Sequence, residues 1–115
     1  MDIIPNAEKA IIDTDKLHGY ILSFSHPLGR FKAAFFQKLG YSIENCDLFE
    51  QCLRQIIITR ETIRIETSRH GRKYIVEGLI TGPSGKKVHL VTVWIILNKE
   101  FIPRFVTAYP RGGLQ

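Results

Sequence analysis

The hydrophobic pattern of the sequence changes its period once, near Thr59, and this change restricts the folds open to the chain. Before that point, apolar residues recur at intervals of three and four residues, which is the spacing of amphipathic helices. After it, segments such as TIRIET alternate between apolar and polar side chains, as half-buried strands do. Helices followed by a run of strands are typical of an α+β domain, in which the helices pack on one face of an antiparallel sheet.

The first half of the chain predicts three helices. The first spans KLHGYILS, residues 16–23, after the cap-forming run Asp13, Thr14 and Asp15. The second runs from about residue 28 to 39 and ends before Gly40, which suits a C-terminal cap; the third runs from about residue 43 to 57 after the cap residue Ser42. The apolar face expected of the second helix consists of Phe31, Ala34, Phe35 and Leu39. The apolar face expected of the third helix consists of Leu48, Phe49, Cys52, Leu53 and Ile56.

The second half predicts about four antiparallel strands, at residues 62–67, 73–80, 88–97 and 104–109. In the first strand, Ile63 and Ile65 share one face. The segments SRHGR and TGPSGK are turn sequences. The third strand is apolar at nearly every position, so we expect it to be central and buried on both faces, with Trp94 in the core.

The two ends of the chain carry weaker patterns. Residues 1–12 suit either an extra edge strand or a tail, and residues 111–115 suit a frayed tail. The length of 115 residues is close to the commonest size of one domain, so we expect a single domain spanning 1–115.

The sequence lacks membrane and secretion signals. No apolar run is long enough for a membrane-spanning helix, and MDIIPNAEKAIID has neither the basic segment nor the cleavage site of a secretory signal. We therefore expect a soluble, cytoplasmic protein with no membrane partner. Cys46 and Cys52 lie six residues apart in a predicted helix and point to different sides, which favours two small hydrophobic residues in a reduced protein.

The charge of the chain is unevenly distributed. The formal net charge is +5, yet residues 1–53 hold five Lys/Arg and seven Asp/Glu, whereas residues 54–115 hold eleven and four. A basic C-terminal half favours a polyanionic partner, nucleic acid first. An acidic protein partner and a merely soluble basic surface are the alternatives.

Several familiar catalytic motifs are missing from the sequence. There is no GxxxxGK[ST] phosphate loop, no GxGxxG after a strand, no HExxH and no GxSxG. The carboxylates are scattered rather than clustered, which disfavours a two-metal nuclease centre. We therefore expect no metal and no cofactor.

The remaining candidate residues are cationic, aromatic or hydroxylic, and they fall into three groups. These groups are His26, Arg30 and Lys32; Arg69, His70, Arg72 and Lys73; and Arg104, Thr107 and Tyr109. Such side chains are sufficient to cleave RNA without a metal, because the reaction needs a base, a proton donor and cations that stabilise the phosphate. Each residue alone also suits a structural reading, as a solvated helix face, a charged turn or a strand former.

The first and third groups can meet in one composite site. Arg30 lies near the start of the second helix, where free backbone N–H groups favour a phosphate. Thr107 and Tyr109 are two residues apart on a strand and so share a face, whereas Arg104 has the opposite parity. The groups converge if the face of Thr107 and Tyr109 meets the second helix.

Four sequence blocks carry a resemblance to a family of small bacterial domains. The blocks are the helix KLHGYILS, HPLGRFKAAFFQKLGY, GRKYIVEGLITGPSGKKVHLVTVW and PRFVTAYP, and together they reach from about Asn6 to Pro110. The order of helices and sheet and the last strand resemble the barnase–EndoU–colicin–RelE group of metal-independent ribonuclease toxins. This resemblance implies catalytic roles for His26, Arg30, Lys32, Thr107 and Tyr109. It leaves Arg72, Lys73 and Arg104 as substrate-binding residues.

One position departs from the family pattern. Phe31 follows the Gly-Arg pair, where related sequences often carry a polar or basic residue. If His26 is the single histidine of the site, the opposite proton-transfer role falls to Lys32 or Tyr109, and either needs a shifted pKa near pH 7.

The resemblance implies a toxin of a toxin–antitoxin pair that cleaves RNA by 2′-hydroxyl transesterification. Its partners would be an RNA substrate and a cognate, acidic antitoxin or immunity protein. Two alternatives stay open: a non-catalytic module that binds nucleic acid or protein, and the antitoxin or immunity partner itself. The basic isoelectric point argues mildly against the last, since inhibitors of cationic nucleases tend to be acidic.

Overall fold

The computed structural model describes residues 3–21 and 29–111, and of residues 20–21 and 29–31 it describes the backbone alone. His26 and residues 112–115 of the predicted tail lie outside these ranges.

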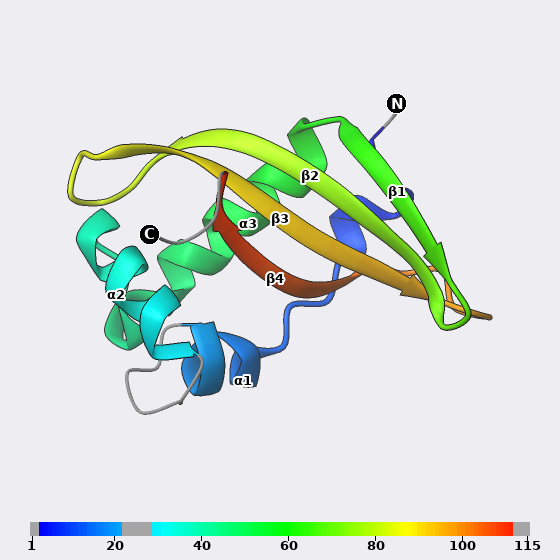
Figure 1. Ribbon diagram of the computed structural model, residues 1–115, viewed down its shortest axis with the longest axis horizontal. Helices are drawn as coiled ribbons and strands as arrows, with labels where there is room; N and C mark the ends of the chain where they lie inside the picture. Colours follow the sequence, from blue (N-terminus) through cyan, green and yellow to red (C-terminus); the bar gives the residue numbers. More distant parts are fainter. Residues whose placement is uncertain (1–2, 22–28, 112–115) are drawn as a thin grey trace.

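Within the described ranges the fold is the predicted α+β arrangement, with three α-helices before a four-stranded antiparallel sheet (Figure 1). Three short 3-10 or π-helical turns, labelled η, accompany the α-helices. The helical elements are η1 (Ala7–Lys9), α1 (Thr14–Lys16), η2 (Leu17–Ile21), α2 (Gly29–Leu39), η3 (Ile43–Asn45) and α3 (Cys46–Thr59). The strands are β1 (Thr62–Ser68), β2 (Gly71–Thr81), β3 (Lys87–Leu97) and β4 (Arg104–Pro110).

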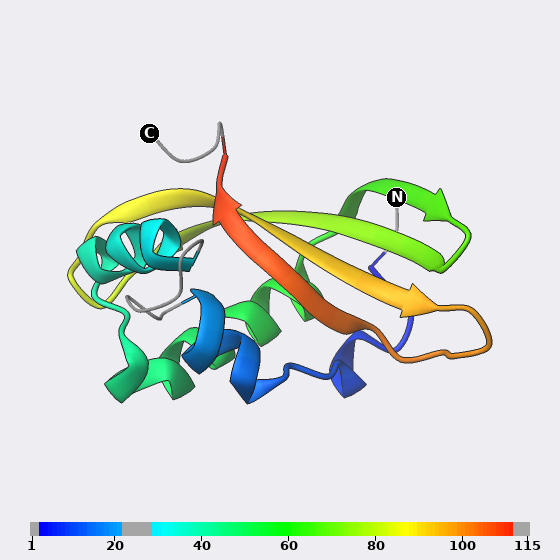
Figure 2. The same cartoon turned by 60° about the horizontal axis from the view of Figure 1, so that its bottom comes forward.

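The strands follow one another in the order β1-β2-β3-β4, and each pairs antiparallel with its neighbour. Five consecutive residues of β3, from Leu90 to Trp94, are buried, which confirms that this strand is central and buried on both faces. Figure 2 shows α1 and α3 together on one side of the sheet. We call that side the inner face and the opposite side the outer face.

The inner face holds the main core. Trp94 is fully buried there, as predicted, and its ring packs edge-on against Phe105 with ring centres 5.2 Å apart. Trp94 Nε1 donates to Thr92 Oγ1 at 2.9 Å, and Thr92 Oγ1 donates to the Val76 carbonyl at 2.7 Å. The buried polar atoms of both side chains are therefore satisfied, as a closed core requires.

The N-terminal segment lies along the free edge of β4. Ile11 forms an isolated parallel bridge with Arg104. Its N–H donates to the Pro103 carbonyl at 2.9 Å, and its carbonyl accepts from the Phe105 N–H at 2.9 Å. These bonds satisfy backbone groups that an edge strand would otherwise expose.

The C-terminus of α2 is tied to the β2–β3 hairpin loop. Gly40 has a φ of +101°, and the Tyr41 N–H donates to the Phe36 carbonyl at 2.9 Å, which is the bond of a Schellman cap. The prediction of Gly40 as the cap is thus confirmed. The Ser84 N–H of the loop donates to the Leu39 carbonyl at 3.0 Å, so the loop also serves as a cap of this helix.

The predicted apolar face of α2 is confirmed in part. Leu39 is buried and Phe35 packs against the core as expected, whereas Ala34 is exposed and Ala33 and Phe36 are buried instead. The side chain of Phe31 lies outside the described part of the structure. The segment FKAAFF offers apolar residues around much of the helix, so periodicity alone does not decide which of them face the sheet.

The third helix also differs in part from its prediction. Ser42 precedes η3 rather than α3 directly, and its N–H donates to Asn45 Oδ1 at 2.7 Å. Phe49, Leu53 and Ile56 are buried as expected, together with Ile57, whereas Leu48 is exposed.

The first strand forms where predicted, at the edge of the sheet, but it is not half-buried: each residue after Thr62 is exposed. Ile63 and Ile65 are both exposed, whereas Thr62 is buried. The register shifts between Thr62 and Arg64, which leaves Ile63 as an extra residue in the pairing with β2.

Candidate functional site

The structure joins the helical group of candidate residues to the last strand through one hydrogen bond. Lys32 lies in the first turns of α2 and is half-buried. Its Nζ donates to Thr107 Oγ1 of β4 at 2.5 Å. This bond brings the first turn of α2 to Thr107, whereas the apolar side of α2, with Phe36 and Leu39, packs in the main core.

The environment of Lys32 changes its acidity. Burial, and to a lesser extent the neighbouring charge of Lys16, lower the pKa of the Lys32 ammonium. Lys16 itself donates to the Val106 carbonyl at 3.4 Å, on the edge of β4. A pocket forms beside these groups and is lined by Asp15, Lys16, Gly19, Lys32, Val106 and Thr107.

Thr107 and Tyr109 share the outer face of the sheet. Thr107 pairs with Val93 and Tyr109 pairs with Val91, and paired residues project to the same side. Tyr109 packs against a small outer cluster of Ile75, Val91 and Val93. The hydroxyl-bearing residues Thr107 and Tyr109 of β4 therefore share the outer face with these aliphatic side chains.

A β-bulge corrects the expectation for Arg104. Val106 is an extra residue between the pairs Val93–Thr107 and Trp94–Phe105. The bulge reverses the parity of the strand, so Arg104, which pairs with Ile95, lies on the same face as Thr107. Its Nε lies 3.1 Å from Glu100 Oε1, near the β3–β4 turn.

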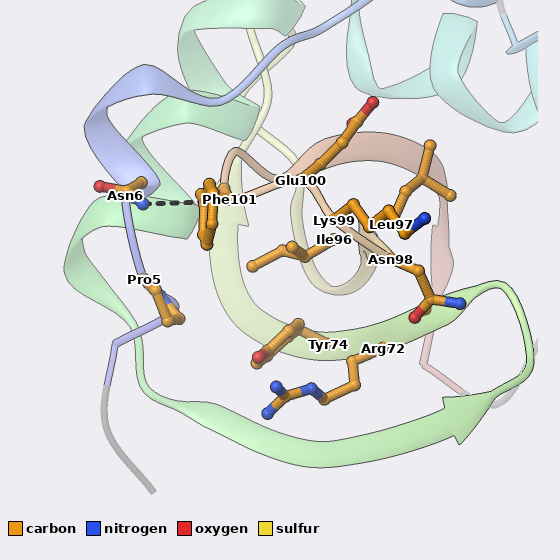
Figure 3. A pocket seen from close by; sticks show the side chains of 11 residues that line it. Pro5, Asn6, Arg72, Tyr74, Ile96, Leu97, Asn98, Lys99, Glu100 and Phe101 are labelled. Atoms are coloured by element: carbon orange, nitrogen blue, oxygen red, sulfur yellow. Dashed lines mark hydrogen bonds between the residues drawn. The ribbon is translucent and has the colours of Figure 1, made fainter.

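The neighbours Lys73 and Arg72 of β2 divide between the two faces. Lys73 pairs with Ile95 and therefore lies on the outer face with Arg104. Arg72 pairs with Ile96, on the inner face, and lines a separate pocket beside Tyr74 and Phe101 (Figure 3). The structure thus separates Arg72 from the group that contains Thr107.

The remaining predicted residues are only partly described. Arg30 is the second residue of α2, near the free N–H groups of the helix start, as expected. His26 lies outside the described residues.

The structure also assembles a charged group that the sequence analysis missed. Glu77 of β2 lies with its Oε1 2.6 Å from Nε2 of His89 on β3, and Arg111 Nε lies 3.7 Å from the same oxygen. Glu77 pairs with Val91, so the group shares the outer face with Tyr109. One feature of the sequence indicates this contact. TGPSGK predicts a hairpin loop, and pairing the strands on either side of it brings Glu77 and His89 close together.

The described ranges contain no cluster of three or more His, Cys, Asp or Glu side chains that would suit a metal ion. Of the helices in those ranges, none combines the length and apolar character required to span a bilayer.

Comparison with known proteins gives a family and a fold. The family model described as Domain of unknown function (DUF6883) matches residues 3–112. A solved structure of a contact-dependent growth inhibition toxin–immunity protein complex from Klebsiella pneumoniae 342 contains a similar chain, with a TM-score of 0.68 and 21% identity. That match covers 87% of this chain and 98% of the other, and at this identity it shows a shared fold. No curated protein sequence matches the chain.

Proposed function

This chain belongs to the DUF6883 family, and we propose that it is a metal-independent endoribonuclease that acts as the toxin of a toxin–antitoxin pair. In the proposed reaction the ribose 2′-oxygen attacks the adjacent phosphorus and the bond to the 5′-oxygen breaks. A 2′,3′-cyclic phosphate and a free 5′-hydroxyl remain. The reaction needs a base for the 2′-hydroxyl proton, cations for the phosphate and a proton for the leaving oxygen.

The observation that carries the proposal is the hydrogen bond between Lys32 Nζ and Thr107 Oγ1. A phosphate at this junction would meet the ammonium from α2 and the hydroxyls from β4 at the same time. We assign Lys32 and Arg30 to hold the scissile phosphate, and Thr107 and Tyr109 to position it. His26 serves as base or acid.

The cations of the outer face suit the rest of the RNA. Lys73 and Arg104 flank Ile95 on the row next to Thr107. Successive rows on one face of a strand are roughly 7 Å apart, so these cations extend the site beyond one nucleotide. Arg72 projects from the inner face and is not part of this path.

The proposed toxin would require a cognate protein that neutralises it. The net charge of +5 favours an acidic antitoxin or immunity protein, since opposite surface charges speed association and discourage wrong partners. The toxin–immunity complex that shares this fold is consistent with such a partner.

The proposal is tested by incubating the purified protein with total RNA in EDTA. We expect cleavage that leaves 2′,3′-cyclic phosphate ends. Lys32→Met should lower the rate about 100- to 1,000-fold, the effect of removing one preorganised charge-stabilising donor. Lys38→Met is the matched control, because Lys38 lies on the exposed side of the same helix and should leave the rate unchanged.

Three outcomes would contradict the proposal. They are no cleavage by the wild-type protein, equal loss in both lysine variants, and full activity of a His26→Ala variant. Salt-sensitive RNA binding without cleavage would instead favour the non-catalytic module. In bacteria, induced expression should arrest growth, and Lys32→Met should relieve the arrest.

A further inference from the structure

The turn between β3 and β4 carries an aromatic side chain that the core does not use. Phe101 is 77% exposed, the largest fraction among the exposed large hydrophobic side chains that the structure describes. Its backbone is nevertheless fixed, because the Phe101 carbonyl accepts from Asn6 Nδ2 at 2.8 Å and the Glu100 N–H donates to the Leu97 carbonyl at 3.0 Å. A single exposed apolar residue is common in proteins, so its surroundings decide whether it binds another molecule.

Phe101 separates two pockets at this end of the sheet. It lines the pocket of Figure 3, together with Arg72 and Lys99, and it also lines a second pocket, together with Lys9 and Arg104. Their volumes, about 350 and 380 Å³, are in the range of small-ligand sites. In Figure 3 the Phe101 side chain lies on one side of the first pocket and Arg72 on the other. A flat group placed beside the ring would therefore have a cation within reach.

Positive charge predominates in the two pockets. The cations that line them are Lys9, Arg72, Lys99 and Arg104. Glu100 is the single acidic side chain of the lining, and its Oε1 lies 3.1 Å from Arg104 Nε, whereas none of the ion pairs within the described ranges includes the other three cations. Proteins bind single-stranded nucleic acid with this combination, in which a base stacks on an aromatic ring while cations attract the phosphates.

The two pockets lie at the end of the outer-face path described above. Arg104 lies on the outer face, one row from Thr107, and also lines the second pocket beside Phe101. RNA that leaves the junction of Lys32 and Thr107 along this face therefore reaches Arg104 and then the β3–β4 turn. There it meets the ring of Phe101 before it reaches the inner-face pocket that contains Arg72.

We propose that Phe101 is a stacking platform for a base of the RNA substrate outside the scissile nucleotide, with Arg72 and Lys99 binding the adjoining phosphate. The inference rests on the proposed function, because it assigns a further contact to the same substrate. Every base has a π-face, so the platform adds affinity without selecting a sequence. Phe101 does not touch the reacting atoms, and its loss should therefore raise the KM for RNA and leave kcat unchanged.

The test measures the binding of two single-stranded RNAs that cannot be cleaved because each 2′-hydroxyl is methylated. One strand carries its bases, and the other has the same backbone with abasic nucleotides. Phe101→Ala should raise the Kd for the base-containing strand about 5- to 150-fold, the effect of losing one stacked base. For the abasic strand the change should be less than about twofold, because the phosphate contacts remain.

Matched variants separate stacking from charge and from general surface effects. Phe101→Trp keeps a flat ring and should retain the affinity for the base-containing strand. Leu79→Ala removes another exposed hydrophobic side chain, which is 61% exposed on β2, and should leave both Kd values unchanged. Arg72→Met should weaken binding of both strands and reduce the slope of log Kd against log salt by about 0.7, the value of one phosphate contact on a single strand.

The outcomes distinguish this inference from the proposed function. If wild-type protein binds RNA but cleaves none, the proposed function fails, and the two strands still decide the role of Phe101. If wild-type protein cleaves RNA while Phe101→Ala binds the base-containing strand normally, only the stacking platform is overturned, and a protein partner is favoured for the exposed ring. Equal losses on both strands in Phe101→Ala, or no binding of either strand by wild-type protein at low salt, would also overturn the platform.

Discussion

The two faces of the sheet are built from alternate residues of the same strands, yet their polar groups are used differently. On the inner face the hydroxyl of Thr92 bonds only to neighbours within the core, namely Trp94 Nε1 and the Val76 carbonyl. On the outer face the hydroxyl of Thr107 accepts from the lysine of another element, and Glu77 approaches a histidine. The hydroxyl of Thr92 is thus satisfied within the core, whereas Thr107 and Glu77 contact the titratable side chains of Lys32 and His89.

The difference teaches where to look for function in a small domain. Ile75, Val91 and Val93 of the outer face are 4–7% exposed, almost as buried as the inner core. Burial therefore does not distinguish the two faces. The two faces differ because the buried cluster of the outer face is small and aliphatic, and because titratable groups from three strands surround it.

The largest expected effect is on the inner face. Trp94→Ala should lower the free energy of unfolding by about 3–5 kcal/mol, because it removes a fully buried ring and leaves a cavity. The neighbouring Val93→Ala on the outer face should cost about 1.5 kcal/mol, near the value of two buried methylene groups. Urea denaturation measures both, and equal losses would remove the contrast between the faces.

An intermediate effect separates the two threonines. Thr92→Val should cost about 1–3 kcal/mol of stability, because it leaves Trp94 Nε1 buried without an acceptor, while RNA cleavage per folded molecule stays unchanged. Thr107→Val should do the reverse and reduce cleavage at nearly constant stability. Melting curves and cleavage rates on the same preparations check the pair, and a shared pattern in both variants would contradict the division.

The smallest effect concerns the pH dependence of stability at Lys32. Because its pKa is lowered in the folded protein, the charged form is disfavoured there relative to the unfolded chain. The stability of the wild-type protein relative to Lys32→Met should therefore rise as pH increases through the lowered pKa. It should level off above the ordinary lysine value of 10.5. Urea denaturation from pH 7 to 11 measures the difference, and a fall over this range would contradict the sign.

Local sequence patterns predicted most of the fold. The change of period near Thr59, the cap at Gly40 and the apolar run through Trp94 each depend on neighbours in the chain, and each matches the structure. The full buried face of α2 did not follow from its sequence, because choosing between Ala33 and Ala34 requires knowing where the sheet lies. Local periodicity has no access to that tertiary information.

The candidate site was predictable to a smaller extent. The shared face of Thr107 and Tyr109 follows from strand geometry alone. The position of Arg104 did not, because the bulge at Val106 is visible only in the pairing of β3 with β4. The contact of Glu77 with His89 likewise depends on the exact register of a hairpin, which the turn sequence suggests without fixing.

The bonds between the β2–β3 loop and the end of α2 give this helix the mechanics of a lever clamped at one end. Ser84 holds the carbonyls of Leu39 and Lys38, whereas Lys32 lies seven residues earlier, roughly 10 Å along the axis. A tilt of about 5° at the clamp would shift Lys32 by roughly 1 Å, and misplacements of that size can cost about 100-fold in rate. Sequence changes in a loop that touches no substrate would thereby tune the proposed reaction from a distance.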